Sequence, residues 1–325
     1  MSSYRSRYKG SILIIVLWTL FILGALAIAI NSYVWPQLNF AGKFRDRVKA
    51  LYAAKAGAKL VIAQVVQDKD TGYDSLKDPW YSDEAFRDVP VGQGPAAAGD
   101  SSFSVSVKDE ESKININKAK QDVLKQVFVL SADADESVAK EIAASIIDWR
   151  DADDKPLENG AETGYYAGQD PSYPCKNADF QVLGELLQVR GMTQQILDAS
   201  KDYLTVYGLG AVNLNTCGET VLRALGASEE LARKIVAYRK GLDGEEGTDD
   251  DMVFDNISGA VAALSKSGGF SSQELSQVAA IIASGSMTVR SDNFTGRSDG
   301  RSGGKTYGIT FTFNRNDVIK QWRSD

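Results

Sequence analysis

The apolar positions at the start of the chain form one unbroken run. Residues 12–30 contain a single polar side chain, Thr19, and the charge-free stretch extends from Gly10 to Gly42. About 20 apolar residues in a helix span the hydrocarbon core of a bilayer, whereas the apolar part of a signal peptide has only about 7–15 residues. The run therefore predicts a transmembrane helix over residues 11–31.

The residues on either side of this span predict its orientation and its continuation. Arg5, Arg7 and Lys9 precede it. Because basic residues favour the cytoplasmic side, the sequence predicts a single-pass protein with a cytoplasmic N-terminus and an outward-facing remainder. After Pro36, apolar residues of the segment 40–66 recur at helical spacing. We therefore expect one long helix, kinked at Pro36, that begins in the membrane and ends on a globular domain.

Alternating apolar and polar positions predict strands in two parts of the chain. Residues 103–107 and 114–116 alternate on either side of a polar turn, and so do residues 284–291 and 305–315 near the C-terminus. The segment 296–305 is rich in Gly and Ser, which predicts a mobile loop. Helical periodicity prevails between the two pairs of strands, and the fold class is therefore α+β.

The helical region contains an internal repeat. Asn115 and Asn117 recur as Asn213 and Asn215 at a constant offset of 98, and an amphipathic helix follows each pair. Asparagine at the end of a strand commonly caps free backbone N–H groups. We interpret these four side chains as structural caps rather than ligands.

The composition excludes several classes of function. The net charge is −7, the pI is about 4.9, and there is no histidine. Catalytic sites that need histidine are excluded, and the commonest zinc ligand is missing. Residues 186–197 resemble a helix-hairpin-helix module, but ten acids in residues 133–162 would repel a phosphate backbone. We expect a packing role for this hairpin and no nucleic-acid partner.

Acidic residues concentrate in two stretches. Residues 243–255 hold seven acids and no base, and we expect an exposed turn there. Residues 148–162 hold six acids, which repel one another unless a cation neutralises them. Calcium, with its six to eight oxygen ligands, fits such a loop better than zinc, although a solvated acidic loop explains the pattern as well. The candidate ligands are Asp151, Asp153, Asp154 and Glu162, with Asp148 and Glu158 as lesser candidates.

Cys175 and Cys217 are the only cysteines. If the globular part lies outside the inner membrane, an oxidising compartment favours a disulfide between them. Two free thiols remain the alternative.

The N-terminus resembles that of type IV pilins and pseudopilins. In that family a prepilin peptidase cuts after the glycine that ends a basic leader, and the helix stays as the stem of the subunit. The resemblance places the cut between Gly10 and Ser11, with methylation of the new N-terminus. Most members carry a glutamate at the fifth residue after the cut, where this chain has Ile15. That departure, together with the repeat and its "NLNT" motif, resembles the minor pseudopilin K family of the type II secretion system.

This resemblance implies a pilin-like organisation in five parts. The leader peptide would be residues 1–10 and the transmembrane helix residues 11–31. The pilin-like helix and first strands would occupy residues 32–118, and an inserted helical domain residues 119–284. Residues 285–325 would supply the C-terminal strands of the pilin-like domain.

The resemblance also implies function and partners. The chain would be a non-enzymatic subunit at the tip of a periplasmic pseudopilus that takes part in the export of folded proteins across the outer membrane. Its partners would be the minor pseudopilins I and J, other pseudopilins, the prepilin peptidase and the bacterial inner membrane. Calcium would bind the acidic loop of residues 148–162.

Two alternatives from other classes remain open on the sequence. A membrane-anchored, calcium-dependent hydrolase could use the carboxylates of residues 148–162, since two carboxylates suffice for glycoside hydrolysis. A helix that continues past the membrane argues against it, because an enzyme needs only a tether. A type IV pilus tip adhesin is separated from a secretion subunit only by the family resemblance.

Overall fold

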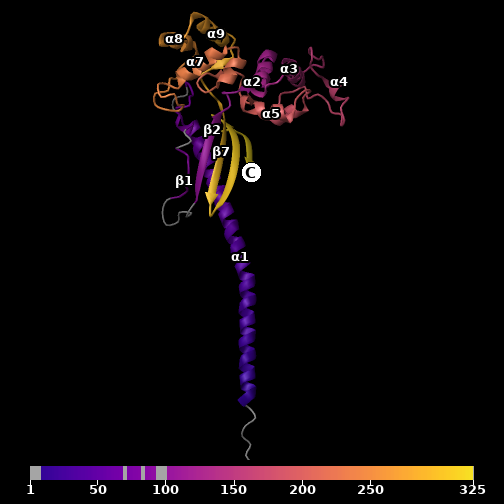
Figure 1. The fold of residues 1–325 in the computed structure, drawn as a ribbon, viewed down its shortest axis with the longest axis vertical. Coiled ribbons are helices and arrows are strands. Elements are labelled where there is room, and N and C mark those ends of the chain that lie inside the picture. Colours follow the sequence, from indigo (N-terminus) through magenta and orange to yellow (C-terminus); the bar gives the residue numbers. More distant parts are fainter. Residues whose placement is uncertain (1–8, 69–71, 82–84, 93–100, 325) are drawn as a thin grey trace, which may run out of the picture.

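The structure, a computed structural model, describes residues 9–68, 72–81, 85–92 and 101–324. Figure 1 shows a long helix, a sheet packed along the end of this helix that lies inside the body, and a helical insert beyond the sheet. The insert therefore lies at the end of the molecule remote from the apolar part of the helix. Most of the predicted leader peptide lies outside the described residues.

The long helix α1 runs without interruption from Lys9 to Val66 and contains Pro36. Its 58 residues correspond to about 87 Å at the usual rise of an α-helix. The large apolar side chains before Phe44 are exposed, whereas Ala54 and Val61 are fully buried beneath the sheet. The prediction of one continuous helix from the membrane span into a globular domain is confirmed.

The sheet has five antiparallel strands in the order β1-β2-β7-β8-β9. The strands are β1 Val89–Pro90, β2 Ser102–Asp109, β7 Asn293–Ser302, β8 Lys305–Asn314 and β9 Ile319–Ser324. Their inner face and the 3-10 turn η1, Pro79–Tyr81, form one hydrophobic core with α1. Two strands that are far apart in sequence, β2 and β7, pair over their length, from Ser102 with Arg301 to Asp109 with Phe294.

The prediction of a loop over residues 296–305 is wrong. These residues form most of β7 and its turn into β8, and only Gly303 and Gly304 lie in the turn. After Phe294, the inward positions of β7 carry small residues. A Cβ at Gly300 would overlap the backbone of Ala50 and Ala54 in α1, and one at Gly296 would overlap the ring of Phe311. This part of the strand has no large inward side chain and therefore has the composition of a loop.

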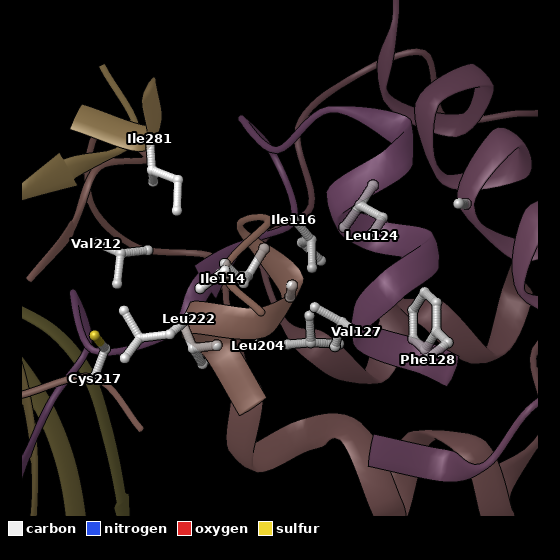
Figure 2. Close-up of a cluster of buried hydrophobic side chains, with 14 of the residues drawn as sticks. Ile114, Ile116, Leu124, Val127, Phe128, Leu204, Val212, Cys217, Leu222 and Ile281 are labelled. Carbon is white, nitrogen blue, oxygen red and sulfur yellow. The ribbon is translucent and has the colours of Figure 1, made fainter. Parts of the chain in front are cut away.

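The insert consists of short helices and two small parallel pairs of strands. Its helices are α2 Gln121–Ala132, α3 Glu136–Arg150, α4 Thr163–Tyr166, α5 Gln194–Ser200, α6 Glu219–Ala224, α7 Glu229–Arg239, α8 Ala260–Ser267 and α9 Ser272–Ala283. Its 3-10 turns are η2 Leu183–Gln188, η3 Lys201–Tyr203 and η4 Ile257–Gly259. Figure 2 shows part of its single hydrophobic core.

The short strands correct a second expectation. Residues 114–116 were expected to pair across a turn with residues 103–107. Instead β3, Ile114–Asn115, pairs in parallel with β4, Leu204–Thr205. Likewise β5, Val212–Asn213, pairs with β6, Met287–Thr288, which was expected to be a strand of the pilin-like domain. These strands belong to the insert.

The four repeated asparagines hold the backbone of the insert in two equivalent places. Asn117 exchanges two hydrogen bonds with the backbone of Phe180, at 2.8 and 2.9 Å. Asn215 makes the same pair of bonds with Phe254, at 2.9 and 3.0 Å. Their structural role agrees with the interpretation from the sequence, but they are not helix caps. α2 and α6 begin after Lys120 and Gly218, several residues downstream.

An arginine completes each repeat. Arg150, at the end of α3, donates to the carbonyl oxygens of Ile116 and Ala119. Arg239, at the end of α7, donates to those of Leu214 and Cys217 at 2.8 and 2.7 Å. The acceptors correspond at the same offset of 98 as the asparagines, so the two halves of the insert share one backbone design.

Candidate functional site

Three carboxylates converge where α3 ends. Asp148 lies in the last turn of α3, Asp151 directly follows the helix, and Glu162 immediately precedes α4. One oxygen from each lies within 4.8 Å of the others. Asp148 and Glu162 are buried, with exposed fractions of 0% and 4%.

Several oxygens of this cluster have no donor. Asp151 Oδ1 and both carboxylate oxygens of Glu162 are buried and accept no hydrogen bond of ordinary geometry from the described residues. Burial raises the pKa of Asp148 to about 6 and also raises the pKa values of Asp151 and Glu162. The neighbouring Cys175 thiol nevertheless favours the charged form of Glu162, which offsets part of the rise in its pKa. Because an unpaired buried oxygen is costly, the cluster is suited to a bound cation.

The loop between these carboxylates explains why Asp148 faces the site. Both Asp148 oxygens accept the N–H of Leu157 at 3.1 Å. The chain then passes so close that a Cβ at Gly160 would overlap the Asp148 carboxylate. The loop therefore folds over Asp148, and this glycine is needed for the close approach.

Three of the predicted ligands have other contacts. Asp153 Oδ1 accepts the N–H of Lys155 at 2.8 Å, and Asp154 Oδ1 accepts that of Thr163 at 3.3 Å. Glu158 is 85% exposed and lies 3.4 Å from Lys140 Nζ. Of the four main candidates, the structure brings together Asp151 and Glu162, and it adds Asp148, which the sequence ranked lower.

The donor set agrees with a hard cation. All three side chains offer carboxylate oxygens, which suit calcium or magnesium better than zinc. Calcium tolerates the irregular geometry of such a loop better than magnesium does.

The two cysteines are free thiols, so the predicted disulfide is not formed in the structure. Cys175 lies beside the carboxylate cluster, with its sulfur 3.7 Å from the carbonyl oxygen of Asp148. Cys217 belongs to the second repeat, where its carbonyl accepts from Arg239. The two residues occupy different halves of the insert, a separation that the sequence does not indicate.

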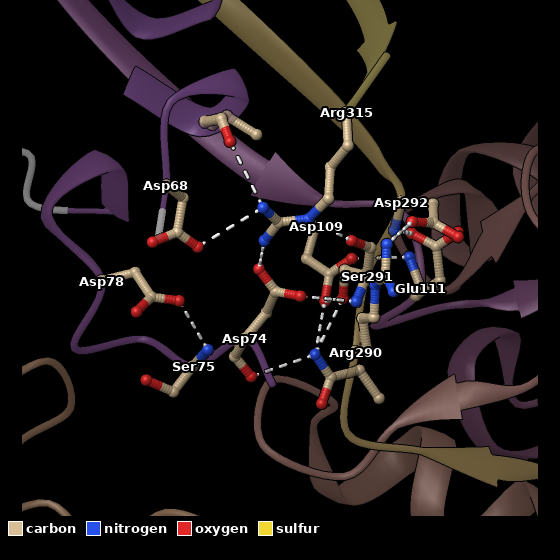
Figure 3. A network of polar contacts seen from close by, with 12 residues as sticks. Asp68, Asp74, Ser75, Asp78, Asp109, Glu111, Arg290, Ser291, Asp292 and Arg315 are labelled. Carbon is tan, nitrogen blue, oxygen red and sulfur yellow. Dashed lines mark hydrogen bonds and ion pairs between the residues drawn. The ribbon is translucent and has the colours of Figure 1, made fainter. Parts of the chain in front are cut away.

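A buried polar network joins the insert to the sheet (Figure 3). Asp109, at the end of β2, accepts from Ser291 Oγ at 2.6 Å and from Asn213 Nδ2 at 3.2 Å. Asp74 accepts from the Ser291 N–H at 2.7 Å and pairs with Arg315. Burial raises the pKa of Asp74 to about 7, although the Ser291 amide and the Arg315 guanidinium favour its charged form.

The sequence did not indicate this network, because Asp109 falls in the polar turn predicted after residues 103–107. The network also includes Asp74, Asn213, Ser291 and Arg315, which are distant from Asp109 along the chain. The only available signal was Asn213 of the repeat, whose side chain reaches across to the sheet.

The N-terminal features remain predictions. α1 begins at Lys9, so the predicted cut between Gly10 and Ser11 falls in its first turn, where side chains lie outside the described residues. The helix is long and apolar enough to cross a membrane. Ile15 stands at the position of the usual family glutamate and is 62% exposed.

A family model for protein K of the type II secretion system matches residues 105–209. The chain is 26% identical over 220 residues to a putative type II secretion system protein K of Escherichia coli K12, covering 64% of this chain and 65% of that protein. It is 25% identical over 223 residues to protein K of Aeromonas hydrophila, covering 65% and 67%. The chain is thus similar to type II secretion system protein K over about two thirds of its length.

The matched segments span about two thirds of the length of these protein K relatives. The crystal structure of the GspK-GspI-GspJ complex from the type 2 secretion system of enterotoxigenic Escherichia coli is also similar, with a TM-score of 0.63 at 16% identity. The alignment covers 89% of this chain and 99% of that one. The expected α+β fold is thus confirmed. The region matched by the protein K family model includes the carboxylate cluster.

Proposed function

We propose that this chain is a minor pseudopilin at the tip of the type II secretion pseudopilus and takes part in the export of folded proteins across the outer membrane. The position of the insert carries this proposal. It covers the end of the pilin-like body remote from the apolar stem (Figure 1). A subunit with such a cover leaves no surface on which a further pilin-like subunit could stack.

Minor pseudopilins I and J are the proposed partners, together with other pseudopilins of the same filament. The related crystal structure is a complex of GspK with GspI and GspJ. Before assembly the subunit would sit in the inner membrane by its single helix, with the body in the periplasm and the leader removed at Gly10 by the prepilin peptidase. The hydrolase and the adhesin are not favoured by the similarity to protein K or by the fold.

Co-isolation tests the proposal. The full chain is expressed with I and J of its own secretion system and the prepilin peptidase, and is then purified in mild detergent through a tag on I. We expect this chain and J to be retained, and the N-terminal sequence of this chain to begin at Ser11. Gly10→Ala should leave the leader in place. A chain that begins elsewhere, or that never co-isolates with I and J, would contradict the proposal.

Calcium is the proposed ligand of the carboxylate cluster, held by Asp148, Asp151 and Glu162. The unpaired buried oxygens of Asp151 and Glu162 support it. The ion would supply positive charge that orders the loop after α3, and it has a structural rather than a catalytic role. Isothermal titration of the chelated protein should show calcium binding that Glu162→Gln weakens strongly. The matched variant Glu158→Gln should bind as before, because Glu158 faces solvent.

A further inference from the structure

The surface of α1 changes where the apolar stem meets the body. Large apolar side chains from Ile12 to Phe40 are exposed. Tyr33 and Trp35 follow the predicted span of residues 11–31, as aromatic residues do at membrane interfaces. Lys43 is the first charged residue after this span and follows its end by 12 residues, about 18 Å of helix. A span that crosses the hydrocarbon core therefore brings the residues after Phe40 just outside the headgroup layer.

Basic side chains gather at this level in a group that we call the basic collar. It comprises Lys43, Arg45, Arg47 and Lys49 of α1 with Arg301 and Lys305 at the β7–β8 turn. A Cβ at Gly303 of this turn would overlap the Asp46 carboxylate, so the turn and the helix segment lie side by side. All collar side chains except Lys49 are exposed.

Acidic residues offset only part of this charge. Arg45 pairs with Asp46 at 2.9 Å, and Arg301 pairs with Asp88. Six bases and two acids leave a net charge of +4 at this end of the body. The predicted insert, residues 119–284, holds 27 acids against 14 bases. The protein is therefore electrically polarised, with its basic end next to the stem and its acidic end remote from the stem.

We propose that the basic collar binds anionic phospholipid headgroups while the stem lies in the membrane. The geometry fits, because the collar is the first charged surface after the predicted span and its long side chains face the headgroup layer. Lysine and arginine at this depth bind phosphate oxygens and are attracted by the negative surface potential of anionic lipid. Binding would hold the body against the bilayer. If the proposed secretion function holds, these contacts break when the subunit leaves the membrane for the pseudopilus.

Lipid selectivity of the full chain tests this proposal. The protein is reconstituted in phosphatidylcholine bilayers, and electron spin resonance compares its association with spin-labelled phosphatidylglycerol and phosphatidylcholine. We expect phosphatidylglycerol to be preferred several-fold at low salt, since one basic residue contributes about a five-fold factor at an anionic surface. The preference should fall toward unity in 0.5 M salt. It should also fall in the Lys43→Gln/Arg47→Gln variant.

The chain is used after removal of the leader, because Arg5, Arg7 and Lys9 would themselves attract anionic lipid at the other end of the span. As a matched control, Lys120→Gln/Lys266→Gln removes two exposed bases of the insert and should keep the preference. A preference that survives loss of Lys43 and Arg47, or that falls equally with Lys120 and Lys266, overturns the proposal. Replacing chloride by inorganic phosphate at equal ionic strength should change nothing, and a specific loss would instead indicate a site for free phosphate. Co-isolation with I and J does not enter this measurement, so the two proposals can fail separately.

Discussion

The two repeats of the insert share a backbone design but neutralise charge differently. Each holds its chain with an asparagine, an arginine and an aromatic pair. The ring centroids of Trp149 and Phe180 lie 6.5 Å apart in the first repeat, and those of Tyr238 and Phe254 lie 5.5 Å apart in the second. Around Arg150 the first repeat has the buried carboxylate cluster of Asp148, Asp151 and Glu162.

The second repeat has no carboxylate at the positions that correspond to Asp148 and Asp151, and one of these positions is basic. Counted from the shared arginine, Asp148 and Asp151 of the first repeat correspond to Ala237 and Lys240. Glu246 Oε1 lies 3.7 Å from Arg239 and 3.8 Å from Lys240. The second repeat thus supplies its own cations, whereas the first leaves carboxylate oxygens unpaired. A bound cation would therefore act on the first repeat and not on the second.

The arginines should show the largest difference between the repeats. Arg239 is 4% exposed, so Arg239→Ala should leave two buried carbonyl oxygens without a donor and cost about 3–5 kcal/mol. Arg150 is only partly buried, and Arg150→Ala should cost about half as much, because its acceptor Ala119 is partly exposed and can be hydrated. Urea unfolding followed by circular dichroism measures both. Equal losses would mean that the repeats are equally closed to solvent.

Asn117 and Asn215 should contribute equally to the stability of the two repeats. Asn117→Ala and Asn215→Ala each remove two buried hydrogen bonds and should each cost about 2–3 kcal/mol. Asn256, which caps η4 at the surface, is the matched control, and Asn256→Ala should cost about 1 kcal/mol. If one of these two asparagine substitutions leaves the free energy of unfolding in urea unchanged, the two repeats are equivalent in structure but not in energy.

Calcium should act on the first repeat alone. Saturation at a hundred times its Kd adds about 2.7 kcal/mol if the ion binds only the folded state. Hydrogen exchange should show that chelation lowers protection around residues 151–166 and leaves residues 240–255 unchanged. Asp151→Asn should abolish the response. Equal loss of protection in both loops would remove the proposed distinction between the repeats.

The response to pH should change sign with calcium. The pKa of Asp148 is raised to about 6 from 3.8, so the folded protein binds more protons than the unfolded chain between these values. The chelated protein should therefore lose stability as the pH rises from about 4 to 6. With calcium the trend should reverse, because binding requires deprotonated carboxylates. Melting temperatures measured from pH 4 to 6 with and without calcium test this change of sign. Asp148→Asn should make the melting temperature of the chelated protein nearly independent of pH in this range.

The thiols should show the smallest difference. Burial raises the pKa of Cys175 to about 12 and that of Cys217 to about 11. Both should resist alkylation in the folded protein and react once it is unfolded, because only the thiolate is nucleophilic. A reductant should leave the melting temperature unchanged. A single disulfide found by mass spectrometry of the non-reduced protein would contradict the structure.

The sequence predicted the parts of the fold that depend on local periodicity. The continuous helix, strands β2 and β8, and the repeat all have such patterns. It failed for β7, because inward glycines that admit α1 look like loop residues. It also failed for β3 and β6, since two-residue strands carry no alternation, and their parallel partners lie 90 and 75 positions away along the chain.

The candidate metal site was predicted in place but only partly in composition. The excess of acid located the loop, and Asp151 and Glu162 were among the expected ligands. Asp148 was ranked lower because it lies inside the helix, and no local rule shows that Gly160 lets the chain fold back over it. Asp153 and Asp154 do not join the three converging carboxylates, and instead accept the backbone N–H groups of Lys155 and Thr163.

The pairing of β2 with β7 has a consequence for the order of folding. Asp109 and Ser291 are 182 positions apart in the sequence, yet they are hydrogen-bonded where β2 ends and β7 begins. Contacts this distant in sequence make folding slow, because an unfolded loop of that length must close first. A folded insert removes most of this entropic cost, since its two ends already lie side by side. The pilin-like sheet should therefore form last, after the domain that interrupts it, and a short linker from Asp109 to Phe294 should let the sheet fold without waiting for the insert.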